Sequence, residues 1–182
     1  MARNLEIKAI CSDLDAAAAR ARALGATYVG VLRQRDTYFH CPRGRLKLRE
    51  IAGAEAELIA YDRPDQPDAR YSAFWLVPVS DPIALREALS RTLGIRGVVA
   101  KTRTLYRYGR TRIHLDRVED LGDFVELETA ADGRPEAEVA AECAAVRAAL
   151  GIEEGALLAG SYLDLLLAQQ GDSASASTVK AS

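Results

Sequence analysis

Apolar and polar residues alternate along much of this chain, and such a period of two predicts β-strands. The alternation is clear at residues 46–49, which read Leu-Lys-Leu-Arg, and at residues 113–116, which read Ile-His-Leu-Asp. Several strand candidates are joined by short turn-like links, which favours antiparallel hairpins. The segments expected to form strands are 4–10, 27–39, 45–52, 55–63, 70–79, 97–108, 111–118 and 123–130.

Other segments carry helix signals, with a capping residue or proline at the start and often a glycine after the end. Asp81-Pro82 before one segment and Gly94 after it are the clearest pair. The unit strand–helix–strand–strand also occurs twice along the chain. We therefore expect an α+β domain over residues 1–170 and a disordered tail over residues 171–182. The expected helices are 13–24, 82–93, 135–150 and 161–169.

The polar faces of the strands are unusual, because they hold mostly charged residues sorted by sign. Residues two apart share one face of a strand, so Lys101 and Arg103 point the same way, as do Glu126 and Glu128. A solvated face of an ordinary antiparallel sheet remains one explanation. However, like charges on neighbouring strands repel, and a bound ligand of opposite charge would offset this repulsion.

Eight antiparallel strands can close into a barrel that is wide enough for one small ligand. If the charged faces point inward, the interior becomes a basic tunnel with an acidic patch. Arginine and lysine would then neutralise a chain of phosphates, and carboxylates would bind Mg²⁺ or Mn²⁺. Such an arrangement favours phosphoryl-group chemistry achieved by positioning and electrostatics.

A series of motifs in this order resembles the CYTH superfamily, which contains class IV adenylyl cyclases and thiamine triphosphatases and is also called the triphosphate tunnel metalloenzymes. The resemblance covers about residues 3–167 and is strongest to the cyclase-like branch. It implies an eight-stranded antiparallel tunnel with flanking helices. The motifs that carry the resemblance are 4–8 (Asn-Leu-Glu-Ile-Lys), 35–39, 46–50, 101–103, 113–116, 121–128 (Leu-Gly-Asp-Phe-Val-Glu-Leu-Glu) and 161–166.

The resemblance also implies roles for individual residues and a Mg²⁺ or Mn²⁺ cofactor. The implied metal ligands are Glu6, Asp116, Glu126 and Glu128. Catalytic roles are implied for Glu6, Lys8 and Glu126. The residues expected to bind a triphosphate are Lys8, Arg35, Lys47, Arg49, Arg63, Lys101, Arg103 and Arg112.

Asn4 departs from the family pattern, because it stands where the first glutamate of the Glu-x-Glu-x-Lys motif is expected. A neutral amide oxygen binds a divalent cation more weakly than a carboxylate does, so the number of metal ions stays open. The implied function is conversion of ATP to cyclic AMP and pyrophosphate. The alternatives are hydrolysis of tripolyphosphate, thiamine triphosphate or a nucleoside triphosphate, and binding of a polyphosphate or nucleotide without turnover.

The overall charge limits the expected partners. The chain has 24 basic and 26 acidic residues and a net charge of -2, which argues against a protein that coats nucleic acid. There is no apolar run of about 20 residues and no apolar leader, so no membrane association is expected. Three widely spaced cysteines predict reduced thiols and a cytoplasmic location. The expected partner is a small triphosphate, and a homodimer is compatible with the sequence.

Overall fold

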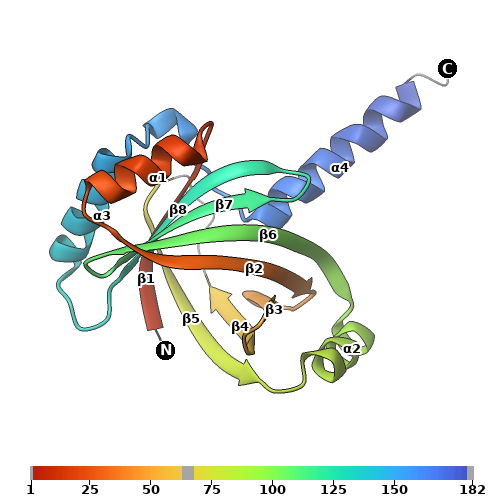
Figure 1. Ribbon diagram of the computed structural model, residues 1–182. Helices are drawn as coiled ribbons and strands as arrows, with labels where there is room; N and C mark the ends of the chain where they lie inside the picture. The colour runs from red at the N-terminus through yellow and green to blue at the C-terminus, as the bar shows by residue number, and fades with distance from the viewer. Residues whose placement is uncertain (1, 63–67, 180–182) are drawn as a thin grey trace.

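The computed structural model describes residues 2–62 and 68–179, which form a closed barrel with helices packed outside it (Figure 1). Its strands are β1 (Ala2–Ile10), β2 (Thr27–Phe39), β3 (Arg45–Ile51), β4 (Ala56–Asp62), β5 (Arg70–Val79), β6 (Ile95–Tyr108), β7 (Thr111–Val118) and β8 (Gly122–Ala130). Its helices are α1 (Leu14–Ala23), α2 (Pro82–Leu93), α3 (Glu136–Leu150) and α4 (Tyr162–Val179), with a 3₁₀ turn at Glu154–Ala156. The expected α+β barrel with flanking helices is confirmed.

Every pair of neighbouring strands is antiparallel, and the order around the barrel is β1-β5-β4-β3-β2-β6-β7-β8. Strand β1 closes the ring, because Glu6 is in register with Arg70 of β5 on one side and with Glu128 of β8 on the other. The N-terminal strand therefore lies between two strands that come much later in the chain. Closure leaves the described sheet without a free edge.

The strand order confirms the twofold repetition predicted from the sequence. In this symmetry β1 corresponds to β5, β2 to β6, β3 to β7 and β4 to β8. Exchanging every strand with its counterpart leaves the set of neighbouring strands around the ring unchanged. Helix α1 then corresponds to α2, since each follows the first strand of its half. The barrel is thus built from two copies of one strand–helix–strand–strand–strand unit.

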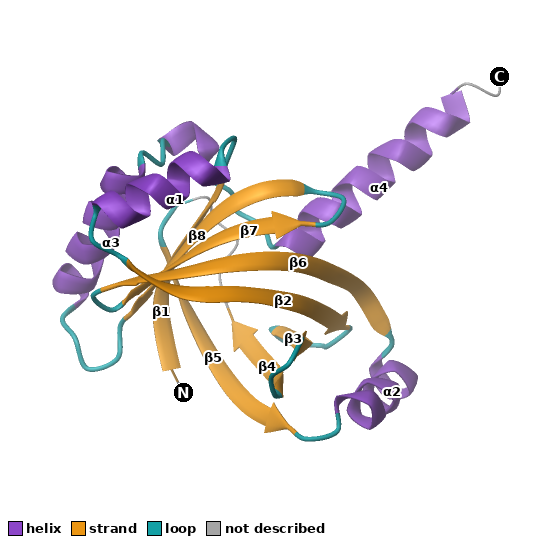
Figure 2. Cartoon of the chain, in the orientation of Figure 1, coloured by secondary structure: helices purple, strands orange, loops and turns teal. Residues whose placement is uncertain are grey.

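The main apolar core lies outside the barrel wall, between β1, β7 and β8 and the helices α1 and α3, which cover them in Figure 2. Leu5 and Ile7 of β1 point to this side, while Glu6 and Lys8 between them line the cavity inside. The alternation therefore puts the apolar face outward under the helices and the charged face inward. Other core residues are Ala17, Ala21, Ile113, Leu115, Leu127, Val139, Val146 and Leu150.

Local signals explain where the helices begin. The side chain of Asp13 accepts a hydrogen bond from the Ala16 amide at 2.9 Å, and that of Asp81 accepts one from Ala84 at 3.0 Å. These bonds satisfy amide groups that a first helical turn leaves without partners. Helix α3 ends at Gly151, whose φ of 67° is in the left-handed region that glycine adopts easily.

Helix α4 is longer than expected and projects away from the barrel in Figure 1. The expected segment ended at residue 169, but the helix runs from Tyr162 to Val179. Extending a formed helix costs far less than starting one, which explains its continuation past the last apolar residues. Residues 180–182 lie outside the described chain. Among the described helices, none is long and apolar enough to cross a membrane.

Leu127 allows a test of this core, because it is fully buried on the outer face of β8. We expect Leu127→Ala to lower the free energy of unfolding by about 2–5 kcal/mol, through lost burial and the cavity left behind. Val31→Ala is the matched control, since Val31 is 53% exposed on β2. Urea unfolding followed by circular dichroism measures both. Equal losses in the two variants would contradict this location of the core.

Candidate active site

A cavity of about 290 Å³ lies inside the barrel, and charged side chains from six of the strands line it. The cations come from β1, β3, β6 and β7, and the carboxylates come from β1, β4 and β8. These groups approach one another because the period of two directs one face of every strand inward. The charged residues of the lining are Glu6, Lys8, Lys47, Arg49, Glu57, Lys101, Arg103, Arg112, Glu126 and Glu128.

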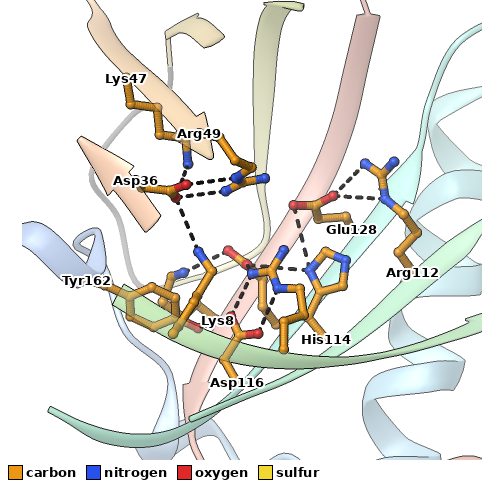
Figure 3. Close-up of polar contacts among 12 residues, drawn as sticks. Lys8, Asp36, Lys47, Arg49, Arg112, His114, Asp116, Glu128 and Tyr162 are labelled. Atoms are coloured by element: carbon orange, nitrogen blue, oxygen red, sulfur yellow. Dashed lines mark hydrogen bonds and ion pairs between the residues drawn. The ribbon is translucent and has the colours of Figure 1, made fainter. Parts of the chain in front are cut away.

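One cluster of cations is centred on Asp36 of β2 (Figure 3). Arg49 donates to its two oxygens through Nε and Nη2, both at 2.8 Å. Lys47 Nζ lies 3.0 Å and Lys101 Nζ 3.2 Å from Asp36 Oδ2. Burial by itself would raise the pKa of Asp36, but the three cations outweigh it and hold the pKa well below its usual value. Asp36 is therefore an anion that holds three cations close together.

A second cluster joins β6, β7 and β8. Arg103 donates to both oxygens of Asp116, at 2.7 Å through Nε and 2.6 Å through Nη2, and also to Glu126 Oε2 at 2.7 Å. Lys8 of β1 donates to Glu126 Oε1 at 2.7 Å. Helix α4 supplies Tyr162, whose hydroxyl donates to Asp116 at 2.9 Å. The ring of Tyr162 lies 3.6 Å from Lys8 Nζ, measured to its centroid.

A third group holds the side chains with metal-binding chemistry. His114, Glu126 and Glu128 each place one ligand atom within 4.8 Å of the others. Arg112 Nε donates to Glu128 Oε2 at 3.0 Å. With the Asn4 amide oriented to satisfy its neighbours, its oxygen accepts from Arg112 Nη2 at 3.1 Å. Asn4 therefore lies at this end of the cavity, but as a neutral hydrogen-bond acceptor.

Burial lowers the pKa of two side chains that line the cavity, Lys101 and His114. Desolvation lowers the pKa of Lys101 to about 7, although Asp36 acts in the opposite direction. Desolvation also lowers the pKa of His114, and the charge of Arg103 adds to this effect. At neutral pH the imidazole of His114 is therefore neutral, as a metal-binding histidine must be.

Most of the site residues expected from the sequence lie together in this cavity. Glu6 is half-buried on β1 beside Lys8, in register with Glu128. Asp116 is fully buried, and its carboxylate is held by Arg103 and Tyr162, so it adjoins the cavity without being part of its lining. The expected residues that line the cavity are Glu6, Lys8, Lys47, Arg49, Lys101, Arg103, Arg112, Glu126 and Glu128.

Two expected phosphate ligands are not placed in the cavity. Arg35 is exposed on the outer face of β2, because Gln34 and Asp36 on either side of it are buried and take the inner face. The expectation that Arg35 binds a triphosphate is therefore wrong in this structure. Arg63 lies outside the described residues.

Two residues that contact the charged groups of the cavity were not predicted from the sequence. Asp36 was quoted only as part of a motif, although it shares a strand face with the buried Gln34 and Tyr38. Tyr162 appeared only as part of the motif 161–166, although its hydroxyl and its ring contact the ion pairs. The alternation of inward and outward side chains along β2 could have identified Asp36. The contacts of Tyr162 depend on how α4 packs against the barrel, which the sequence pattern does not show.

We expect Asp36→Asn to lower the free energy of unfolding at pH 7 by about 3–5 kcal/mol, because three buried cations lose their anion. The depressed pKa also sets a pH dependence. The stabilisation by Asp36 is present above its unfolded-state pKa of about 3.9 and is lost as the pH falls through the lower folded-state value.

Urea unfolding at a series of pH values below and above 4 measures both effects. Wild type should lose more stability on acidification than Asp36→Asn does. Asp123→Asn is the control, because Asp123 pairs with the exposed Arg117 outside the barrel and should change stability much less. Similar losses in the two variants would show that Asp36 does not organise the cations.

Comparisons with known proteins agree with this geometry. A family model described as the CYTH domain matches residues 2–162. None of the curated proteins compared matches the chain. Among solved structures, the PH1012 protein of Pyrococcus horikoshii OT3 is 26% identical, with a TM-score of 0.80 over 89% of this chain and 98% of that one.

Two further similar structures are more distant. A proposed adenylate cyclase from Vibrio parahaemolyticus is 19% identical, with a TM-score of 0.72 over 90% of this chain and 97% of that one. A proposed adenylyl cyclase from Hippeastrum, described as having a dominant triphosphatase activity, is 14% identical, with a TM-score of 0.65 over 94% and 96% of the two chains. At these identities the likeness shows the fold alone. The match of the family model over nearly the whole chain shows that this protein belongs to the CYTH family.

Proposed function

We propose that this protein is a divalent-metal-dependent enzyme that acts on a triphosphate, with cyclisation of ATP to cyclic AMP and pyrophosphate as its first candidate reaction. The observation that carries the proposal is the convergence of lysine and arginine side chains with a group of carboxylates in one cavity inside the closed barrel. The CYTH family includes adenylyl cyclases and triphosphatases, which agrees with this assignment.

The cation cluster suits a chain of phosphates. Arg49 and Arg103 each donate two hydrogen bonds to one carboxylate, and these bonds fix the orientation of the guanidinium plane. Their remaining N–H groups therefore have fixed directions. Lys8 and Lys101 add point charges from neighbouring parts of the wall. Cations fixed before the substrate arrives stabilise the charge that develops on phosphate oxygens in the transition state, with little reorganisation at the moment of reaction.

The residues present also fit a divalent cation. Glu126 and Glu128 supply carboxylate oxygens, and His114 supplies a ring nitrogen that makes no hydrogen bond of normal geometry with the described residues. Glu6 lies on the neighbouring strand in register with Glu128 and is proposed as a further ligand. A metal bound there would supply Lewis-acid stabilisation of the phosphate oxygens. Asp116 is proposed to act through Arg103, which it orients.

Apolar side chains in the same cavity favour a substrate with an organic group. On five strands an apolar inward residue lies two positions from a cavity-lining polar or charged one, as with Leu105 beside Arg103 and Ile51 beside Arg49. A sugar or a base could contact this apolar part while the phosphates contact the cations. The apolar residues of the lining include Leu32, Ile51, Ile59, Phe74, Leu76 and Leu105.

In the cyclase reaction the ribose 3′ hydroxyl loses its proton to solvent as its oxygen attacks the α-phosphorus, the bond from the α-phosphorus to its bridging oxygen breaks, and pyrophosphate leaves. The cations of the site would stabilise this leaving group. Hydrolysis of a triphosphate by water is the second candidate, because the same cations serve it equally. If a triphosphate binds but is not converted, the protein is a binding module and not an enzyme.

A panel of ATP, thiamine triphosphate and tripolyphosphate, each with Mg²⁺ or Mn²⁺, tests the proposal. We expect turnover of at least one of them, with products separated by anion-exchange chromatography. Lys101→Met should lower kcat/KM by about 100-fold or more, because a fixed cation is lost at the developing charge. Arg91→Ala, an exposed change on α2, should not. No turnover on the whole panel would overturn the enzyme assignment.

Asn4 allows a second test of the metal requirement. We expect Asn4→Glu to raise the affinity for Mg²⁺ several-fold, because a carboxylate is added near Glu128 and hard cations prefer charged oxygen ligands. Asn4→Gln has the same length without the charge and is the matched control. Isothermal titration calorimetry without a triphosphate measures both variants. If Glu and Gln at this position behave alike, the position does not contribute to metal binding.

A further inference from the structure

We propose that His114 is a nitrogen ligand of the metal site and gives this site a preference for transition-metal ions such as Mn²⁺ and Co²⁺ over Mg²⁺. The inference rests on the proposed function, because it concerns the same site. It adds a donor atom to a site that the resemblance describes only by carboxylates. It also states which class of metal ion the chain would select.

The first observation is geometric. Within the part of the chain that the structure describes, His114, Glu126 and Glu128 form the one group of potential ligands close enough to share an ion. Nδ1 of His114 lies 3.5 Å from Glu126 Oε2 and 3.8 Å from Glu128 Oε1. Figure 3 shows the His114 ring next to the Glu128 carboxylate, from neighbouring strands of the barrel wall. Two ligand atoms that are each about 2.1 Å from one ion lie about 3.0–3.4 Å apart for bond angles between a right angle and a tetrahedral one.

The measured separations are therefore only a few tenths of an ångström wider than a shared ion would require. Small side-chain rotations on the three residues would close this difference. The backbone need not move, because His114 is already in register with Glu126 on the neighbouring strand.

The second observation is the state of the imidazole. His114 is 3% exposed, and its Nδ1 makes no hydrogen bond of normal geometry with the described residues; the nearby Glu126 Oε2 lies 3.5 Å away. A buried polar atom without a partner is costly, and such an atom in a native protein indicates a missing ligand or an unseen water. Here the orphan atom is aimed at two carboxylates. A metal ion between them would give this nitrogen its partner.

The nearby cations do not prevent binding. Glu126 already accepts hydrogen bonds from Lys8 and Arg103, and Glu128 accepts from Arg112. Each carboxylate oxygen has more than one lone-pair direction, so it can accept a hydrogen bond and bind a metal. Such outer contacts orient a ligating carboxylate. The arrangement therefore resembles a prepared set of ligands more than a closed ion-pair network.

The mixed donor set determines the expected selectivity. Mg²⁺ prefers oxygen ligands and keeps several waters, so it gains little from an imidazole. The affinity of nitrogen-containing sites rises from Mn²⁺ through Co²⁺ across the first transition series. A site with one ring nitrogen and two carboxylates should therefore bind Co²⁺ and Mn²⁺ more tightly than Mg²⁺. The preference should depend on His114 in particular.

Calorimetric titration of the full chain with Mg²⁺, Mn²⁺ and Co²⁺ alone tests this dependence. We expect His114→Gln to lower the affinity for Co²⁺ and Mn²⁺ by about tenfold or more while changing that for Mg²⁺ little. His40→Gln is the matched control, because His40 is exposed and is the only other histidine of the sequence. Unchanged ratios of affinity in His114→Gln would overturn the inference.

A spectroscopic readout avoids reliance on a variant. Electron spin echo envelope modulation of Mn²⁺ bound to wild-type protein should show coupling to ¹⁴N, and this coupling should change to that of ¹⁵N when only histidine is labelled. The signal should persist in His40→Gln. Bound Mn²⁺ without histidine-nitrogen coupling would overturn the inference, even if His114→Gln fails to fold.

Parallel turnover assays separate this inference from the proposed function. Turnover of a triphosphate without histidine-nitrogen coupling would support the proposed enzyme function and contradict the role of His114 as a metal ligand. Histidine-nitrogen coupling without turnover of any substrate in the panel would support His114 as a metal ligand and contradict the proposed enzyme function. Turnover together with coupling would support both.

Discussion

Charged groups inside a closed barrel are stable only if each one faces an opposite charge, and this constraint organises the whole interior. Asp36 is fully buried and holds Arg49, Lys47 and Lys101, while the buried Arg103 holds Asp116 and Glu126. Removing one partner from such a set leaves an uncompensated charge where water cannot reach it. The barrel wall, its register and the position of α4 all serve to keep these pairs together. The same pairs leave N–H groups and carboxylate oxygens directed into the cavity, so stability and binding depend on one network.

The duplication of the fold shows how one architecture produced two chemically different ends of the cavity. In the first half, Asp36 of β2 lies in register with Arg49 of β3 and binds it through both guanidinium hydrogen bonds. In the second half, the corresponding strands β6 and β7 bring Arg103 into register with Asp116 by the same kind of contact. The ion pair is thus repeated with its signs exchanged. The first half gathers lysines around its carboxylate, and the second gathers carboxylates around its arginine, so the two clusters differ in the sign of their excess charge.

The sequence predicted the parts of this structure that depend on short-range patterns. Alternation located the strands, capping residues and glycines located the helix ends, and the repeated unit agrees with the observed strand order. The inward face of most strands could also be read directly. Arg35 was expected in the cavity because it adjoins a motif, although the alternation of β2 places it on the outer face. The same alternation places Asp36 on the inner face, and it was overlooked. The role of Tyr162 could not be predicted, because it depends on where the last helix contacts the barrel. The length of α4 could not be predicted either, because its C-terminal part continues without a hydrophobic pattern.

The position of β1 between β5 and β8 also has a consequence for how the protein is made. Lys8 and its partner Glu126 are 118 positions apart, and the hydroxyl that completes the Asp116 contact comes later still, at Tyr162. During synthesis the first strand therefore leaves the ribosome long before the strands that will flank it. Pairings of such wide separation form slowly, because much chain entropy is lost before any contact compensates for it. Until β8 emerges, the nascent chain has an exposed strand edge and buried-type charges without counter-charges, so its vulnerable period spans most of its translation.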